Sequence, residues 1–185
     1  MSRAGRALIL APMLAAVAAP ALAAGFAVTS PDFRNGGAIA MRQVFGQCGG
    51  QNVSPALSWS GEPAGTHSFA VTLFDPDAPG GSGWWHWSVF NIPASVHSLP
   101  EGAGSGGSAG LPPGAVQGRN DFGSGGYGGP CPPPGPAHHY RVTIYAVKVP
   151  AVPLDAAAPG AAVGAALKAD ALATAELVGM FGRSR

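Results

Sequence analysis

Short apolar or alternating runs fill the chain between residues 25 and 149 and indicate β-strands. In HYRVTIYAVKV, Tyr140, Val142 and Ile144 would take one face of a strand and the residues between them the other. The run SFAVTLF is almost wholly apolar, which is typical of a central strand covered on both sides. The pattern predicts strands near residues 25–30, 37–44, 56–60, 67–75, 84–92 and 139–149.

The composition turns to alanine from Leu154 onward. The stretch LDAAAPGAAVGAALKADALATAELVGMFGR predicts one or two helices, with Asp155 as an N-cap and Asp170 at the start of the second helix. Helices gathered after a run of strands favour a β-rich α+β fold in which the helices cover a sheet face.

Residues 101–136 are dense in glycine and proline and show no period. A loop this long inside a compact domain is usually functional or mobile. Because aromatic residues and a cysteine lie in its second half, we expect residues 118–136 to be ordered and residues 101–116 to be mobile. The strings GGSAG and GSGGYG lack the strand and helix that a serine hydrolase or a nucleotide site would need around them.

The first 23 residues have the features of a cleaved signal peptide. Arg3 and Arg6 precede the apolar run ALILAPMLAAVAAPALA, which closes on the small-x-small sequence ALA. A membrane anchor is the alternative, but the run contains two prolines and is short for a bilayer, which needs about 20 apolar residues. We therefore expect residues 24–185 to form a single periplasmic or secreted domain, with no membrane segment after cleavage of residues 1–23.

The charge of the expected mature chain is close to zero. Without Arg3 and Arg6 it has eight basic and nine acidic side chains. Proteins that bind nucleic acid, or membranes through polybasic patches, usually carry a clear positive excess. Partners must therefore be recognised by a local site.

Cys48 and Cys131 are the two cysteines of the chain. In an exported protein they would meet an oxidising compartment, where a disulfide is expected. Two buried free thiols are the alternative, because pairing depends on a geometry that the sequence does not contain.

The segment DPDAPGGSGWWHW, residues 75–87, places two carboxylates and a histidine beside three tryptophans. Pro76 ends the strand at Asp75, and Asp77 can cap the turn that follows. In the next strand, Trp85 and Trp87 would face one way and His86 the other. Asp75 and His86 could then converge.

A structural ion pair between Asp75 and His86 is a sufficient explanation of this segment taken alone. A zinc site that recruits His138 is disfavoured, because the histidines and cysteines lack a compact ligand spacing.

Five segments, in their order and spacing, resemble the phosphatidylethanolamine-binding protein family, and most closely its bacterial Raf kinase inhibitor-like branch: GQNVSPALSW (50–59), FDPDAP (74–79), WHW (85–87), NDFGSGGYGGPCPPPG (120–135) and HHY (138–140). The resemblance covers nearly the whole chain after residue 23. It implies a β-sandwich with peripheral helices and a small pocket for phosphate-type anions, such as phospholipid head groups.

The resemblance also implies the residues of the pocket. Asp75, His86 and His138 match pocket residues. Because Asp75 would repel an anion placed against it, we expect it to orient His86 or to meet an ammonium group. The further ligand-binding positions are Ala78, Pro79, Trp84, Tyr127, Gly129 and Pro133. A histidine beside a carboxylate favours its protonated form, which donates to phosphate oxygens. No cofactor and no metal are implied.

Three functions are compatible with these observations. The leading hypothesis is an exported protein that binds a small phosphate-containing anion. The second is a secreted inhibitor of a protease or other enzyme, which would contact its protein target through the pocket rim and residues 101–136. A hydrolase using the Asp–His cluster is the third, but the sequence offers no compelling serine or cysteine nucleophile. We therefore expect a binding protein and not an enzyme.

Overall fold

The computed structural model describes residues 25–107 and 110–184. The predicted signal peptide, residues 1–23, lies outside these residues. None of the helices in the described part of the chain has the length and apolar character that crossing a membrane requires.

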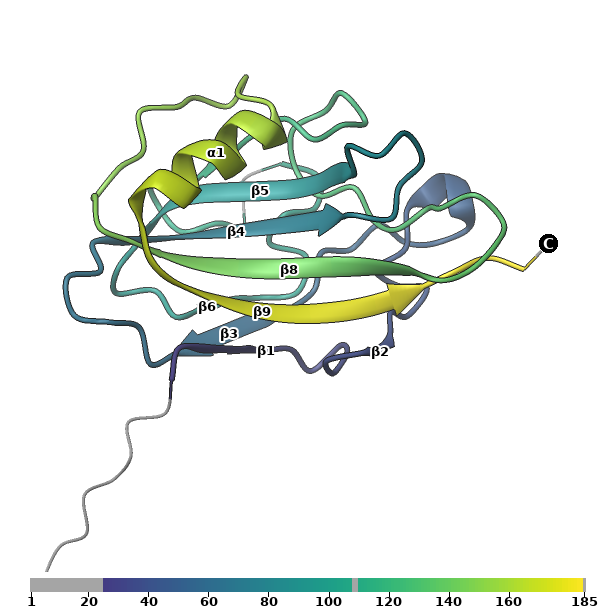
Figure 1. Cartoon of the computed structure of the whole chain (residues 1–185), viewed down its shortest axis with the longest axis horizontal. Coiled ribbons are helices and arrows are strands. Elements are labelled where there is room, and N and C mark those ends of the chain that lie inside the picture. Colours follow the sequence, from purple (N-terminus) through teal and green to yellow (C-terminus); the bar gives the residue numbers. More distant parts are fainter. Residues whose placement is uncertain (1–24, 108–109, 185) are drawn as a thin grey trace, which may run out of the picture.

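Two β-sheets pack face to face (Figure 1). The small sheet has the order β1-β3-β6, with strands Ala27–Thr29, Leu57–Ser60 and Ser98–Leu99. The large sheet has the order β2-β9-β8-β4-β5-β7, with strands Gly37–Ala38, Ala171–Phe181, His138–Val147, Ser68–Asp75, Trp84–Pro93 and Val116–Gln117. A short 3₁₀ helix, η1 (Gly46–Cys48), and the helix α1 (Gly160–Asp170) complete the fold.

The prediction of a strand-rich sandwich is confirmed. Each predicted strand position contains a strand, although the region 37–44 contains only the two-residue strand β2. The short strands β6 and β7 were not predicted, because two residues carry no readable alternation.

The two sheets enclose the main hydrophobic core. Trp59 of β3 packs edge-on against Phe69 of β4, with ring centroids 5.5 Å apart. A second core lies between the large sheet and α1 and includes Ala70 of β4 and Leu167 of α1. Strand β4 therefore faces a core on both sides, as its apolar run predicted. Each large side chain that is fully buried here contributes about 1.5–3 kcal/mol.

The C-terminal segment differs from the prediction of one or two helices. The helix α1 ends at Asp170, and the following eleven residues form β9, which pairs antiparallel with β8. Asp155 is not the N-cap, because α1 begins after Pro159. Asp155 instead accepts a hydrogen bond from the amide of Ala157 at 2.9 Å.

Helix-favouring residues concealed the strand period of β9. Ala175 and Leu177 face the main core, while Glu176 between them is exposed. Alanine and leucine favour helices locally, but the long ladder with β8 and the burial of one face decide the structure.

Strand β5 contains one extra residue opposite β4. Leu73 pairs with Trp87, whereas the next residue of β4, Phe74, pairs with Trp85. His86 is therefore left without a partner in β4, as in a β-bulge. The bulge places two consecutive residues, His86 and Trp87, on the inner side of the large sheet.

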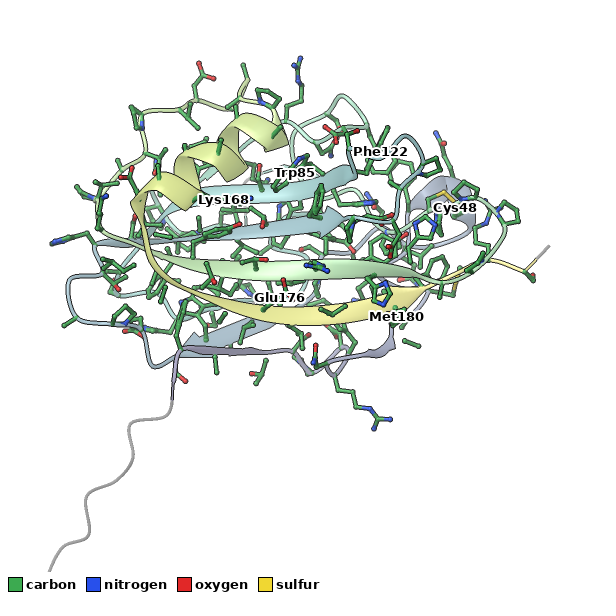
Figure 2. All side chains as sticks on the ribbon, viewed as in Figure 1. Cys48, Trp85, Phe122, Lys168, Glu176 and Met180 are labelled. Carbon is green, nitrogen blue, oxygen red and sulfur yellow. A yellow bond between two sulfur atoms is a disulfide. The ribbon has the colours of Figure 1, made fainter. Side chains whose placement is uncertain are left out.

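The bulge also overturns the expectation that Trp85 and Trp87 share a face. Trp87 lies in the main core, and its Nε1 donates to Oε1 of Gln117 at 2.6 Å. Trp85 lies on the outer side beneath α1 (Figure 2), with its ring centroid 4.6 Å from that of Phe74. The alternation of residues along a sequence does not reveal an extra residue in a strand. It therefore predicted that Trp85 and Trp87 share a face.

We predict that Gly164→Ala destabilises the protein although alanine favours helices over glycine by about 1 kcal/mol. A Cβ at Gly164 would lie 2.4 Å from Cη2 of Trp85, which is held between α1 and the sheet. Overpacking of this kind costs about 1–3 kcal/mol. Urea unfolding should show that loss, and a matched Gly125→Ala variant, whose Cβ meets nothing within 4 Å, should show little change. A Gly164→Ala protein as stable as the wild type would contradict this packing.

Candidate functional site

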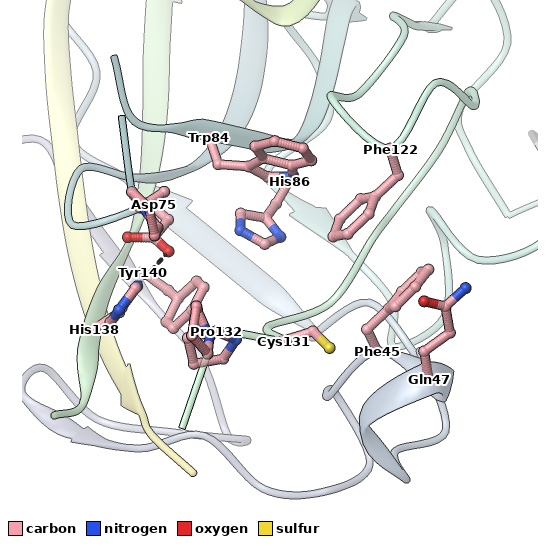
Figure 3. Close-up of a pocket in the computed structure, with 13 residues that line it drawn as sticks. Phe45, Gln47, Asp75, Trp84, His86, Phe122, Cys131, Pro132, His138 and Tyr140 are labelled. Carbon is pink, nitrogen blue, oxygen red and sulfur yellow. Dashed lines mark hydrogen bonds and ion pairs between the residues drawn. The ribbon is translucent and has the colours of Figure 1, made fainter. Parts of the chain in front are cut away.

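A cavity of about 350 Å³ lies at one end of the large sheet, where β4 ends and β5 and β8 begin (Figure 3). It combines residues from these three strands with residues from η1 and from the loop before β8. The lining residues are Phe45, Gln47, Asp75, Ala78, Pro79, Trp84, His86, Phe122, Cys131, Pro132, Pro133, His138 and Tyr140.

The turn between β4 and β5 brings Asp75 and Trp84 opposite each other. Gly81 and Gly83 in this turn have φ angles of 78° and 71°, which side-chain-bearing residues rarely adopt. Oδ1 of Asp75 accepts a hydrogen bond from the amide of Asp77 at 2.8 Å. The carboxylate that caps the turn is therefore that of Asp75, and not that of Asp77 as predicted.

Asp75 is bonded to His138 and not to His86. Its Oδ2 lies 2.8 Å from Nδ1 of His138, and the residue is only 3% exposed (Figure 3). Because the turn occupies the other carboxylate oxygen, the expectation that Asp75 orients His86 is wrong. The bond to Asp75 leaves Nε2 as the free ring nitrogen of His138.

A second aspartate–histidine pair lies beside the first. Oδ2 of Asp77 accepts hydrogen bonds from the backbone amide and from Nδ1 of His139, each at 2.7 Å. The backbone bond, followed by the ring bond, lowers the pKa of Asp77. Together the two pairs fasten the β4–β5 turn to the start of β8.

His86 is held by the backbone of Gly128. Nδ1 of His86 lies 2.8 Å from the carbonyl oxygen of Gly128, and the amide of Gly128 donates to the carbonyl of His86 at 2.9 Å. Because a carbonyl oxygen only accepts, Nδ1 carries the ring proton. Burial lowers the pKa of His86 and outweighs the opposing effects of this bond and of the charge on Asp75. His86 is therefore neutral near pH 7, contrary to the expectation of a protonated ring.

Tyr140 lies next to both histidines. Its ring centroid is 5.2 Å from that of His86 and 6.4 Å from that of His138. Burial, followed by the negative charge of Asp75, raises the pKa of Tyr140 well above its usual value. The same carboxylate of Asp75 is the nearby acceptor for the Tyr140 hydroxyl, whereas the buried Nε1 of Trp84 has no hydrogen-bond partner within the described residues. One donor, Nε1 of Trp84, therefore lies unsatisfied in a side chain that lines the cavity.

Aromatic rings form the opposite wall. Phe45 and Phe122 stack with ring centroids 4.4 Å apart and planes 12° apart. Trp84 meets the edge of Phe122 at 5.4 Å. The cavity thus has a polar end with Asp75 and His138 and an apolar aromatic side.

A disulfide joins two parts of this wall. Cys48 of η1 is bonded to Cys131, with their Cα atoms 5.6 Å apart. The amide of Phe45 also donates to the carbonyl of Pro130 at 3.0 Å. These links hold Phe45 beside the proline-rich segment, and Cys131 itself lines the cavity.

The glycine-rich segment packs behind the cavity. Residues 126–130 are buried, in keeping with the expected order of residues 118–136. A Cβ at Gly104 would fall 2.5 Å from the ring of Trp87, so the first part of the segment 101–116 is also tied to the core. Residues 108–109 lie outside the described residues.

Most predicted site residues meet in the cavity: Asp75, Ala78, Pro79, Trp84, His86, Pro133 and His138. Tyr127 and Gly129 do not line it. The hydroxyl of Tyr127 donates to the carbonyl of Gln43 at 2.8 Å inside the core. A Cβ at Gly129 would fall 2.1 Å from the same carbonyl oxygen, so glycine serves there for close backbone packing.

Several residues that line the cavity are not predicted from the sequence: Phe45, Gln47, Phe122, Pro132 and Tyr140. Tyr140 had a readable signal, because it lies two residues after His138 on the same strand face. The expected disulfide was a signal for Phe45 and Gln47, because a bond between Cys48 and Cys131 places them near the proline-rich segment. No local pattern marked Phe122.

Within the described part of the chain, no group of three or more histidine, cysteine, aspartate or glutamate side chains is arranged to hold a metal ion.

Comparisons with known proteins identify the family. Residues 29–182 match the family model of the phosphatidylethanolamine-binding protein. The chain is 50% identical over 177 residues to the UPF0098 protein YbcL of Escherichia coli K12, which covers 94% of this chain and 97% of that protein. It is 39% identical over 155 residues to the putative lipoprotein LppC of Mycobacterium tuberculosis H37Rv, covering 83% and 71% of the two chains.

Solved structures agree with this match. The crystal structure of E. coli YbcL, described as a new member of the mammalian PEBP family, has a TM-score of 0.84 at 51% identity and covers 86% of this chain and 99% of that chain. The putative homologue CT736 of Chlamydia trachomatis has a TM-score of 0.72 at 31% identity, with the same coverage of 86% and 99%. The chain therefore belongs to the phosphatidylethanolamine-binding protein family.

We predict that replacing Cys48 and Cys131 together by serine lowers the free energy of unfolding. The bridge spans 83 residues, for which loop-closure entropy amounts to about 4–5 kcal/mol. Urea titration of the double variant should show a loss approaching that size. Mass analysis of the wild-type protein without reductant should find no free thiol, and two free thiols would contradict the bridge.

Proposed function

We propose that this chain is an exported binding protein whose cavity takes the phosphate of a small ligand or of a phospholipid head group. The observation that carries the proposal is the fixed position of His86, which is 3% exposed, is held through Nδ1 and lines the cavity. His138 lines the same cavity and is likewise held through Nδ1. Both imidazoles are thus left with Nε2 for a ligand oxygen.

The unsatisfied Nε1 of Trp84 supports a ligand with oxygen acceptors. A buried donor without a partner costs about 1–3 kcal/mol. An oxyanion beside Trp84 would give its Nε1 the acceptor that the described residues do not supply.

The negative charge of Asp75 does not exclude an anion. The ring of His138 is bonded to Asp75 through Nδ1 at 2.8 Å, so the imidazole lies between that carboxylate and a ligand at Nε2.

The aromatic wall suits the remainder of the ligand. The cavity of about 350 Å³ lies at the lower end of the usual range of small-molecule sites, about 300–1,000 Å³, and has room for more than a phosphate group. Trp84, Phe45 and Phe122 offer ring faces and edges to an organic group or to an ammonium ion.

The lining favours binding over hydrolysis. Among the described residues that line the cavity there is no serine, threonine or lysine, and Cys131 is bonded to Cys48. A covalent mechanism needs an activated nucleophile within reach of its base.

Three observations support export. The sequence predicts a signal peptide, the structure contains a disulfide, and one relative is named a putative lipoprotein. Disulfides persist mainly in oxidising compartments.

One observation favours inhibition of a protein target as the second candidate function. Phe122 lines the cavity, lies in the 101–136 segment and is 37% exposed. Aromatic residues of this kind are enriched in protein interfaces.

We predict that His86→Ala weakens the binding of phosphoethanolamine and of inorganic phosphate at least about tenfold, because it removes a fixed hydrogen-bonding group worth about 1.5–3 kcal/mol to a charged ligand. Isothermal titration calorimetry measures this loss. His67→Ala, an exposed histidine outside the cavity, is the matched control and should bind as the wild type does. Equal binding by the His86→Ala and wild-type proteins would refute the site, and absence of binding by the wild type would refute the function.

A further inference from the structure

A second pocket, of about 260 Å³, lies on the outer side of the large sheet, opposite the main core. The helix α1 covers only part of this side, and β8 and β9 run uncovered beside it (Figure 1). Lys168 of α1, Thr143 of β8 and Glu176 of β9 line this outer pocket (Figure 2). Among the described residues, those that line the outer pocket and those that line the cavity at the end of the sheet do not overlap.

The floor of the outer pocket is a row of polar side chains. The strand register places Thr143 between Thr72 of β4 and Glu176 of β9. Polar side chains are expected on a sheet face that meets water, but a flat face would leave them exposed. Thr72 is only 1% exposed, although it lines the pocket. This threonine therefore lies at the bottom of a recess and not on an open surface.

The outer pocket has one surplus positive charge. Arg141 and Lys168 line it together with a single carboxylate, that of Glu176. Nη1 of Arg141 lies 3.9 Å from Oε2 of Glu176, which is too long for a hydrogen bond. Lys168 makes no ion pair within the described residues, and the helix dipole that favours a lysine in the last turn of α1 leaves its ammonium group accessible. The two cations can therefore bind one further anionic group.

Tyr145 adds a hydrogen-bond donor to the outer pocket. Burial raises the pKa of Tyr145, although the nearby Thr72 hydroxyl opposes that effect by hydrogen bonding, so the phenol is protonated near pH 7. A hydrogen bond that lowers the pKa of a phenol is one that the phenol oxygen accepts. The O–H proton of Tyr145 is therefore left to donate to a ligand oxygen.

An aromatic side adjoins the cations. Phe74 and Trp85 line the outer pocket with their ring centroids 4.6 Å apart. Phe74 is the register partner of Arg141, so the rings begin one strand away from the guanidinium group. Trp85 is held closely by α1, because a Cβ at Gly160 would fall 2.4 Å from the Cβ of Trp85. The pocket thus offers a fixed apolar surface next to its positive charge.

We propose that the outer pocket is a second ligand site, and that it binds a small monocarboxylate with an aromatic ring. The carboxylate lies between Arg141 and Lys168, whose nitrogens form charge-assisted hydrogen bonds to carboxylate oxygens. The ring of the ligand packs against Phe74 and Trp85. A phosphate dianion suits the pocket less well, since Glu176 would repel its second charge. The inference does not depend on the proposed function, because the two sites share no lining residue within the described chain.

The experiment titrates the ¹⁵N-labelled protein with benzoate and follows the backbone amides by NMR. We expect saturable shifts at Thr72, Thr143 and Glu176, with a dissociation constant of about 1 mM or below. The amide of Gly128, which is bonded to His86 at the other cavity, should not shift. Benzamide lacks the charge and acetate lacks the ring, so each should bind at least about tenfold more weakly than benzoate.

Three variants test the assignment of the residues. Arg141→Gln removes one charge and should weaken benzoate binding at least about tenfold. Thr143→Val keeps the β-branched shape that suits a strand, removes one hydroxyl and should weaken binding about threefold. Arg34→Gln, which removes an exposed arginine outside the pocket, is the matched control and should bind benzoate as the wild type does.

Several outcomes would overturn the inference. Amide shifts that do not saturate by about 10 mM benzoate would indicate an adventitious contact only. Saturable shifts at Gly128 and His86 alone would place benzoate in the other cavity. Equal affinity for benzoate, benzamide and acetate would mean that neither the charge nor the ring is recognised. These three outcomes use the wild-type protein, so they do not depend on the folding of a variant.

Discussion

The candidate site depends on one extra residue in strand β5. In a regular strand, Trp87 could fill the core or His86 could face the cavity, but neighbours could not lie on the same side. The bulge resolves this conflict, because it leaves His86 unpaired with β4 and keeps Trp87 opposite Leu73. The hydrogen bond from His86 to the Gly128 carbonyl then fixes the ring and assigns its proton to Nδ1. The burial of Trp87 in the main core and the position of the His86 ring at the cavity both follow from this local geometry.

The remaining walls are held by links between distant segments. Asp75 and Asp77 bind consecutive histidines at the start of β8, and the Cys48–Cys131 bridge joins η1 to the proline-rich segment. These links lie at the edge of the large sheet where β4 ends and β5 and β8 begin. Side-chain hydrogen bonds and the disulfide therefore hold the loops that bound the cavity. The polar groups of the cavity are therefore fixed in place. His86 and His138 are each held through Nδ1, and both carboxylate oxygens of Asp75 accept hydrogen bonds.

The sequence predicted the strand-rich fold, and it predicted residues that the structure brings together in the cavity. It failed where a non-local contact decided the structure. Residues 171–181 have the alanine content of a helix, yet they form β9 because one face is buried along β8. The partner of His86 was missed for a similar reason, since the Gly128 carbonyl comes from a loop with no periodic signal. Tyr127 and Gly129 matched the pattern of the family, but they pack against Gln43 inside the core and do not face the cavity.

The central claim is that His86 presents an unprotonated Nε2 to the cavity, and ¹⁵N NMR of the histidine rings tests it most directly. In the ligand-free protein at pH 7, with the ring signals assigned by comparison with His86→Gln, Nδ1 of His86 should have the chemical shift of a protonated nitrogen and Nε2 that of an unprotonated one. A ring protonated at both nitrogens, or protonated at Nε2 alone, would contradict the account.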